Sequence, residues 1–467
     1  MAFGTGFMAV AMYFLGKKVR LRSIETGAIT APEMIAGRTG SRNAQISMAS
    51  VLVLATIPYL ALQPRAAGIV VSSLFGGPEW VGAVTITALV VAYTLTGGLK
   101  AVIRTDVFQG VIALGLLWLG LAIVVNDSGG LSSAMATISS SEDTAGLLSR
   151  TGNYTLLIWA STMILWLFAD PMFPQLYQRL CAAESDEAIG RMATFYPTVA
   201  WLAFLPPILI GTIGHIYHPG LDRSGGDNIL PTLILEVGGE WFGGLVLVAG
   251  LAALMSTMDS QLLATGSLVT RDLLTSVSDN KWGRELVIVS LSILGLLLSL
   301  WSDLSILDLG LLAFSMYAVM FPSVFLVANW DSVDGRAVIS SIVAGEAIVI
   351  LAVFSPESFD GWWIRPEGGA MPTVVIPSIV ASIGALVAAQ CFFNKGPGFF
   401  ESMEIKWGVL IPAIPFIVIF ILAQDFWWWD NSSNFAWGLP VWIWWSAALS
   451  IVQTAIMARI VHLDSQR

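Results

Sequence analysis

Long apolar stretches occupy most of this chain, and short polar segments separate them. A helix needs roughly 20 mostly apolar residues to cross the hydrocarbon core of a membrane. Thirteen stretches meet or approach this length, at residues 1–16, 45–75, 80–97, 105–126, 154–176, 193–217, 241–267, 285–302, 305–329, 336–354, 372–393, 407–424 and 437–460. The pattern therefore predicts an all-α, polytopic membrane protein with about thirteen transmembrane helices.

Composition excludes the other broad classes of protein. Of the 467 residues, 56% are hydrophobic and only 12% are charged, whereas soluble domains carry about 25% charged residues. Disorder would require low hydrophobicity and high charge. The formal net charge of −10 argues against nucleic acid as a partner, and the lipid bilayer is expected instead. Cys181 and Cys391 make neither a disulfide framework nor a metal motif.

Lysine and arginine are distributed unequally between the two sets of loops. Eighteen of the 22 basic residues fall in one set. The opposite set holds only Arg150, Arg223 and Arg365, and Arg65 lies inside a span. Because cytoplasmic loops carry the excess of basic residues, we expect a protein of the cytoplasmic membrane with its N-terminus outside and its C-terminus inside. The longest external loop, 127–153, is rich in Ser and Gly and is predicted to be a solvated surface loop.

The seventh span carries polar residues at helical spacing. One stripe of the expected helix holds, at positions i, i+3, i+4 and i+7, Ala253, Ser256, Thr257 and Ser260. Hydroxyl and carbonyl oxygens are hard ligands that suit an alkali cation, and Asp259 on the neighbouring stripe could add a negative charge. The alternative is that these small residues allow close helix packing, with each hydroxyl bonded to the carbonyl four residues earlier.

A second polar segment joins the third and fourth spans. Gly97 and Gly98 interrupt the third span at its cytoplasmic end, and Thr105 and Asp106 open the fourth. Asp106 either caps that helix, whose N-terminus favours negative charge, or faces inward as a cation ligand.

Arg65 stands inside an apolar stretch, beside Gln63 and the helix-breaking Pro64. An unpaired arginine is costly in a membrane. Arg65 could pair with Asp308 or Glu346, or extend its charged end toward the membrane surface. It could equally bind an anionic group of a substrate, which the planar guanidinium suits.

The fifth span contains two prolines, Pro171 and Pro174, close to Asp170. Each proline removes a backbone donor and frees a carbonyl within the span. Such broken helices are typical of transporters, and a plain kink is an equal alternative.

Four segments of the chain resemble recurrent segments of one family, the sodium–solute symporters, and they occur in that family's order. Together they cover residues 1–330. The segments are Thr30-Ala-Pro-Glu-Met-Ile-Ala-Gly-Arg-Thr-Gly-Ser, Tyr93-Thr…Gly97-Gly98-Leu-x-Ala-Val…Thr105-Asp106…Gln109, Gln175…Gln178-Arg179…Ala183…Ser185, and Ala252-Ala253-Leu-Met-Ser256-Thr257-Met-Asp259-Ser260-Gln-Leu-Leu.

The resemblance implies a LeuT-type fold, in which two inverted five-helix repeats hold Na⁺ and a solute near the middle of the membrane. The first four spans would be helices two to five of the first repeat, and spans five to nine would form the second. Residues 1–330 would form the transporter core, and residues 331–467 four additional transmembrane helices. The family has an extra N-terminal helix and an unwound first core helix ahead of the span that opens this chain, so we expect the first repeat to be incomplete.

The resemblance also implies candidate binding residues, with Na⁺ as the coupling ion. Solute contacts would fall near Gln63 and Arg65. The residues implied as Na⁺ ligands are Ala253 through its carbonyl, Ser256, Thr257, Ser260, Asp106 and, where some members have another hydroxyl, Asp259.

The expected function is Na⁺-coupled symport of a small solute by alternating access. A carboxylate-bearing solute, such as an amino acid or an organic acid, is favoured because Arg65 would match its charge. The alternative is a transport-inactive membrane sensor or partner subunit from the same family, in view of the incomplete first repeat. An enzyme is not expected, because no histidine lies in the interior of a span and no segment between spans is long enough for a catalytic domain.

Overall fold

The computed structural model describes residues 2–148, 155–221, 223–277, 280–360, 373–393, 407–428 and 434–466. Within these ranges the chain is predominantly helical, and its one sheet is a hairpin of the short strands β1 (Phe435–Ala436) and β2 (Leu439–Pro440). The helices are α1 (Ala2–Thr26), α2 (Ala31–Thr39), α3 (Arg42–Phe75), α4 (Glu79–Asp127), α5 (Leu131–Ser140), α6 (Leu156–Ala169), α7 (Pro174–Cys181), α8 (Asp186–Tyr217), α9 (Arg223–Leu268), α10 (Lys281–Trp301), α11 (Ile306–Asn329), α12 (Gly335–Phe354), α13 (Val375–Phe393), α14 (Trp407–Leu422) and α15 (Val441–Ser465). Short 3₁₀ or π segments are η1 (Ala145–Leu147), η2 (Asp170–Met172), η3 (Val269–Leu273), η4 (Thr275–Val277), η5 (Pro356–Phe359) and η6 (Phe426–Trp428).

The prediction of an all-α membrane protein is confirmed, and the predicted count of thirteen spans is approximate. Among the described residues, 11 helices are long and apolar enough to cross a membrane, or 12 if one bent pair counts as a single span. The remaining predicted span corresponds to α1. Its apolar part is short and ends at Gly16, directly before Lys17 and Lys18.

The centre of the bundle lies where α3 and α11 meet the segment between α6 and α7. The ring centroid of Tyr59 on α3 lies 5.0 Å from those of Phe173 and Phe314. The hydroxyl groups of Thr56 and Tyr317, also on α3 and α11, are 2.6 Å apart and share a hydrogen bond. Aromatic packing and this buried hydrogen bond therefore join three elements that are distant in sequence.

The fifth span is broken, which is one of the two alternatives that its prolines left open. Helices α6 and α7 are bent by 57° relative to each other, with the 3₁₀ turn η2 between them. Pro171 lies in that turn and Pro174 is the first residue of α7. The prolines cannot donate backbone hydrogen bonds, so an α-helical ladder cannot continue through this segment.

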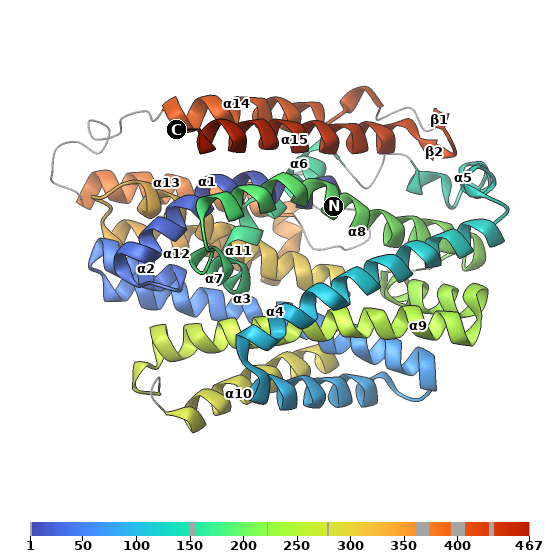
Figure 1. The fold of residues 1–467 in the computed structure, drawn as a ribbon, viewed down its shortest axis with the longest axis horizontal. Helices are drawn as coiled ribbons and strands as arrows, with labels where there is room; N and C mark the ends of the chain where they lie inside the picture. The colour runs from blue at the N-terminus through green and yellow to red at the C-terminus, as the bar shows by residue number, and fades with distance from the viewer. Residues whose placement is uncertain are drawn as a thin grey trace.

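Two of the helices are each composed of two arms. In α4, the arms Glu79–Thr96 and Val107–Asp127 are separate candidate spans, and Figure 1 shows that they run in different directions. In α9 the break falls at Gly239, whose φ of 72° is left-handed. A residue with a side chain adopts this conformation only at a cost, whereas glycine does so freely. The sequence pattern predicted only the second arm of α9, because the first arm carries more charge and is less apolar.

The external loop 127–153 differs from the prediction of a fully solvated loop. Residues 131–140 form α5, in which Ala134, Met135 and Ile138 are buried. They pack with apolar residues of α8 and α9, including Ile213 and Leu233. The apolar face of α5 is narrow, and the many serines around it concealed it in the sequence.

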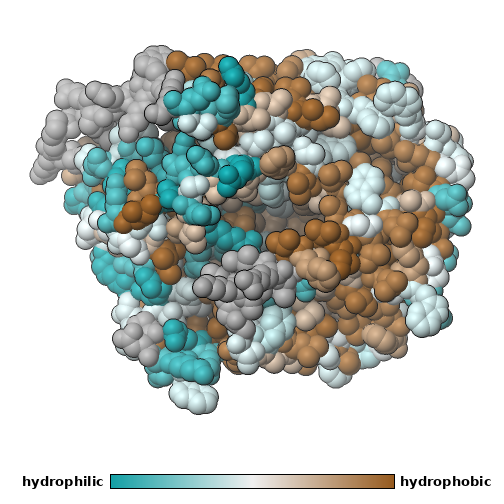
Figure 2. Space-filling view, viewed as in Figure 1, coloured by the Kyte–Doolittle hydropathy of each residue, from teal (hydrophilic) through white to brown (hydrophobic). Residues whose placement is uncertain are grey.

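The bundle has two chemically different ends. Figure 1 shows α2 at one end and α5 with the β-hairpin at the other. In the same view, hydrophilic residues gather at the end that carries α2, and hydrophobic residues cover the region of α4 and α8 (Figure 2). Arg38 belongs to α2 at the hydrophilic end, and Arg271 contacts Glu33 of the same helix.

Candidate cation and solute sites

The second arm of α9 presents the predicted stripe of small and hydroxyl residues. Ala253, Ser256 and Thr257 are partly buried, and Ala253 lines a largely apolar cavity of about 420 Å³. The Thr257 hydroxyl donates a hydrogen bond of 3.0 Å to the carbonyl of Ala253. Both oxygens keep lone pairs that could contact a cation, because a hydroxyl has two lone pairs and a carbonyl accepts more than one bond. This hydrogen bond is the one that the packing alternative predicts, and the cation role of these residues stays a prediction.

Asp259 and Ser260 lie deeper in the protein, with exposed fractions of 2% and 6%. The Ser260 hydroxyl accepts a hydrogen bond of 3.3 Å from the guanidinium of Arg179 on α7. A Na⁺ ion at Ser260 would approach this fixed positive charge, so Arg179 would have to move for a second cation to bind there. The side chains of Thr105 and Asp106 lie outside the described residues, and the predicted cation role of Asp106 stays a prediction.

Arg65 has a partner that the sequence did not suggest. Its Nε lies 3.9 Å from a carboxylate oxygen of Asp227, on the first arm of α9, and its Nη1 donates a 2.8 Å hydrogen bond to the carbonyl of Ser302. Asp308 accepts a 2.8 Å hydrogen bond from Ser305 at the start of its own helix. The partner was missed because Asp227 lies in the arm of α9 that the apolar pattern did not predict.

The predicted solute residues face different surroundings. Arg65 lines a cavity of about 410 Å³ together with Glu79 and Trp80 at the start of α4. Gln63 is 6% exposed and lies within the core side of α3. Helix α3 therefore presents the guanidinium of Arg65 toward this cavity and the side-chain amide of Gln63 toward the protein interior.

The helix break contains polar groups that the sequence analysis did not select. Asp170 is 3% exposed, and its Oδ1 has no hydrogen-bond partner among the described residues. On α9, the fully buried Gln261 and Thr265 also have side-chain atoms without a partner in this part of the chain. A buried carboxyl group within a span is costly, as is a buried guanidinium group. The argument that selected Arg65 from the sequence would therefore also have selected Asp170.

Comparisons with known proteins agree with this architecture. The model of the sodium:solute symporter family matches residues 2–345. A sodium/pantothenate symporter of Haemophilus influenzae is 27% identical over 353 residues, which are 73% of this chain and 72% of that protein. A high-affinity proline transporter of Bacillus subtilis is 28% identical over 72% of this chain and 74% of its own length. The structure of a Na⁺-coupled sialic acid symporter has a TM-score of 0.62 at 19% identity and covers 84% of both chains.

The helical bundle and its centrally broken helix thus have the fold of a Na⁺-coupled secondary transporter, of the LeuT type. The chain belongs to the sodium:solute symporter family. It is a multi-pass membrane transporter that couples the transport of a small solute to that of Na⁺, and it is not an enzyme. The predicted function is thus confirmed as Na⁺-coupled symport of a solute whose identity stays open. The division at residue 330 between core and additional helices stays a prediction.

Proposed function

We propose that this protein imports a carboxylate-bearing solute together with Na⁺ across the cytoplasmic membrane. The hydrophilic end of the bundle, which carries α2, would face the cytoplasm, because basic residues concentrate there. The N-terminus would then lie outside and the C-terminus inside. The observation that carries the proposal is the position of the broken α6–α7 segment beside α9. There, buried polar atoms that have no partner among the described residues lie next to the helix that carries the proposed cation ligands.

The proposed Na⁺ site consists of the Ala253 carbonyl and the hydroxyls of Ser256 and Thr257. The partial exposure of these residues supports the proposal, since an ion must reach its ligands. A second site would use Asp106, Asp259 and Ser260, with Arg179 displaced. A buried Na⁺ needs several oxygen ligands to replace its water shell, so three groups from one helix must be joined by others.

The proposed solute class rests on chemistry shared by the relatives. Proline, pantothenate and sialic acid each carry a carboxylate, and proteins similar to this chain transport them according to their names. Gln63 and Arg65 are the predicted contacts. The positive charge of Arg65 is already shared with Asp227, so Arg65 would meet a solute carboxylate only as part of this pair. Among the described residues, Asp170 at the helix break has a carboxyl oxygen without a hydrogen-bond partner, which offers a further polar contact.

Uptake into proteoliposomes tests this function. The 467-residue chain would be reconstituted, and entry of radiolabelled L-proline, pantothenate, N-acetylneuraminate and glucose would be followed under an inward Na⁺ gradient. We expect one of the carboxylates to accumulate, and the accumulation to stop when K⁺ replaces Na⁺. Accumulation of glucose alone would overturn the solute class. If uptake continued in a H⁺ gradient without Na⁺, the assignment of Na⁺ as the coupling ion would be overturned. If none of the four solutes were taken up, a transport-inactive role would be favoured.

A further inference from the structure

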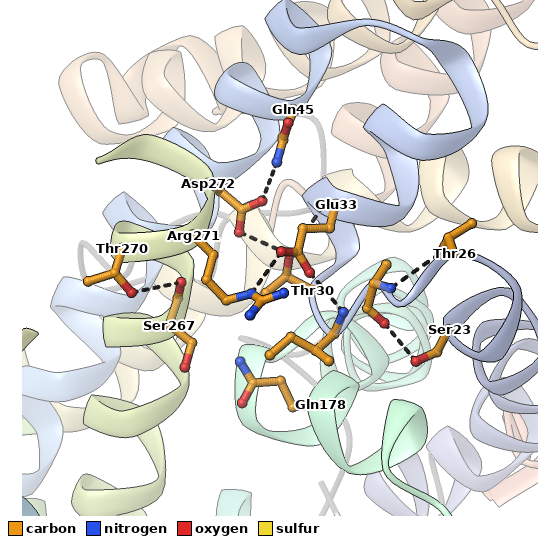
Figure 3. Close-up of polar contacts among 12 residues, drawn as sticks. Ser23, Thr26, Thr30, Glu33, Gln45, Gln178, Ser267, Thr270, Arg271 and Asp272 are labelled. Carbon is orange, nitrogen blue, oxygen red and sulfur yellow. Dashed lines mark hydrogen bonds and ion pairs between the residues drawn. The ribbon is translucent and has the colours of Figure 1, made fainter. Parts of the chain in front are cut away.

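A buried polar network joins α2 and α3 to the end of α9 (Figure 3). Its centre is Asp272, which is fully buried in the π-helical segment η3. One carboxylate oxygen accepts a 2.9 Å hydrogen bond from the Thr30 hydroxyl, and the other accepts a 2.7 Å bond from the side-chain amide of Gln45. A single carboxylate therefore holds the start of α2 and the start of α3 against α9.

The local sequence around Thr30 fixes the direction in which its hydroxyl donates a hydrogen bond. Thr30 is the N-cap of α2, and its hydroxyl accepts a 3.2 Å hydrogen bond from the backbone N–H of Glu33. A hydroxyl has only one proton to donate, and here that proton goes to Asp272. The Glu33 carboxylate in turn accepts a 2.8 Å bond from the N–H of Ile29. The Thr-x-x-Glu pattern thus forms a capping arrangement that also fixes the angle of α2 toward α9.

A second, more exposed contact lies beside the first. The Arg271 Nε is 2.7 Å from a carboxylate oxygen of Glu33, and 43% of the Arg271 side chain is exposed. Exposed ion pairs contribute little, because water screens them. The buried bonds to Asp272 are charge-assisted and shielded from water, so they carry most of the attachment.

The network lies where the interior is sealed at this end. Thr30, Leu52, Tyr177, Gln178 and Leu268 surround a cavity of only about 10 Å³, which is hardly enough for one water molecule. This small cavity also touches Met172 and Pro174 of the broken segment. Separation of these residues would widen this small cavity and connect the helix break to the end that carries α2.

We propose that Thr30, Gln45 and Asp272 form a latch that keeps the cytoplasmic side of the transporter closed and that separates when solute is released inward. The inference rests on the proposed orientation. Asp272 is a positioning residue: it lies 12 residues after Ser260 on the helix that carries the proposed cation ligands, so a shift of α9 moves both. Opening exchanges two protein hydrogen bonds for bonds to water, which makes the latch reversible.

Cysteine accessibility tests the latch directly. Leu268→Cys would be introduced into a chain carrying Cys181→Ser and Cys391→Ser, and its alkylation by a membrane-impermeant maleimide would be timed in inside-out vesicles containing Na⁺. We expect Asp272→Ala and Thr30→Val each to raise the rate about tenfold, because the first removes the carboxylate with both of its hydrogen bonds and the second removes one of these bonds from a buried charge. Thr30→Ser keeps the hydroxyl and should keep the slow rate.

Ser267→Ala is the matched control, because among the described residues the Ser267 hydroxyl donates only to the carbonyl of Leu263, within its own helix. An unchanged alkylation rate in both Asp272→Ala and Thr30→Val, in protein that remains monodisperse in detergent, would overturn the latch. Faster labelling in Thr30→Ser as well would show that the hydroxyl is not the essential group and would also overturn it. Labelling from right-side-out vesicles alone would instead refute the proposed orientation.

Discussion

At the scale of single residues, the hydroxyls of α9 provide the sharpest test of the cation site. Ser256→Ala and Thr257→Ala each remove one oxygen ligand from the proposed Na⁺ site. We expect each change to raise the Na⁺ concentration for half-maximal uptake by about tenfold, equivalent to about 1.4 kcal/mol. Thr232→Val, on the first arm of α9, removes a hydroxyl bonded to Asn228 and should leave Na⁺ dependence unchanged. Wild-type Na⁺ dependence in both α9 variants would assign the stripe to helix packing.

Arg65 and Asp227 provide a second test at this scale. Removing one partner of a mostly buried ion pair leaves an uncompensated charge, so Arg65→Gln and Asp227→Asn should each lower the melting temperature in detergent. The double variant should recover that stability. If Arg65 also meets the solute, the double variant should still show a KM for solute raised several-fold, with unchanged Na⁺ dependence. Recovery of both stability and KM would assign Arg65 to the ion pair alone.

At the scale of elements, the breaks within helices are the features that can be tested. Gly239 separates the arms of α9 in a left-handed conformation, and a Cβ added there would meet no atom within 4 Å. Gly239→Ala should therefore destabilise the protein by about 1–3 kcal/mol through backbone conformation alone. The matched change Gly250→Ala also meets open space but has helical geometry, and it should be neutral or slightly stabilising. Thermal unfolding in detergent measures both. Equal effects would show that α9 has no conformational requirement for glycine at its break.

At the scale of the whole molecule, the orientation can be measured with a natural cysteine. Cys391 is exposed near the end of α13, and Cys181 is half-buried. In a Cys181→Ser chain, a membrane-impermeant maleimide should label Cys391 in inside-out vesicles and not in right-side-out vesicles. A cysteine placed at the exposed Ser139 of α5, in a chain also lacking Cys391, should show the opposite pattern. Reversal of both patterns would invert the proposed topology, including the assignment of the latch.

The local sequence was sufficient to predict the elements that depend on local properties. Apolar length predicted the membrane spans, because each buried backbone group in lipid must be paired within its own helix. Pro171 and Pro174 predicted an interruption of the fifth span, either a break or a plain kink, because a missing N–H acts on its own turn. The spacing of Ala253, Ser256 and Thr257 predicted one helical stripe, and the resemblance of four segments predicted the family.

Tertiary structure alone decided which of these groups meet. Arg65 pairs with Asp227 across 162 residues of chain, which no local pattern encodes. The carboxylate of Asp272 binds Thr30 and Gln45 more than 200 residues away, as their separations of 242 and 227 show. Such contacts depend on how helices pack and on where a break such as Gly239 turns the chain. The sequence by itself therefore determined the class of fold, the approximate positions of the spans and the resemblance to the family. Packing determined whether the fifth span breaks or only bends, and it determined the partners of the buried charges, because electrostatic pairing depends on distance in space and not along the chain.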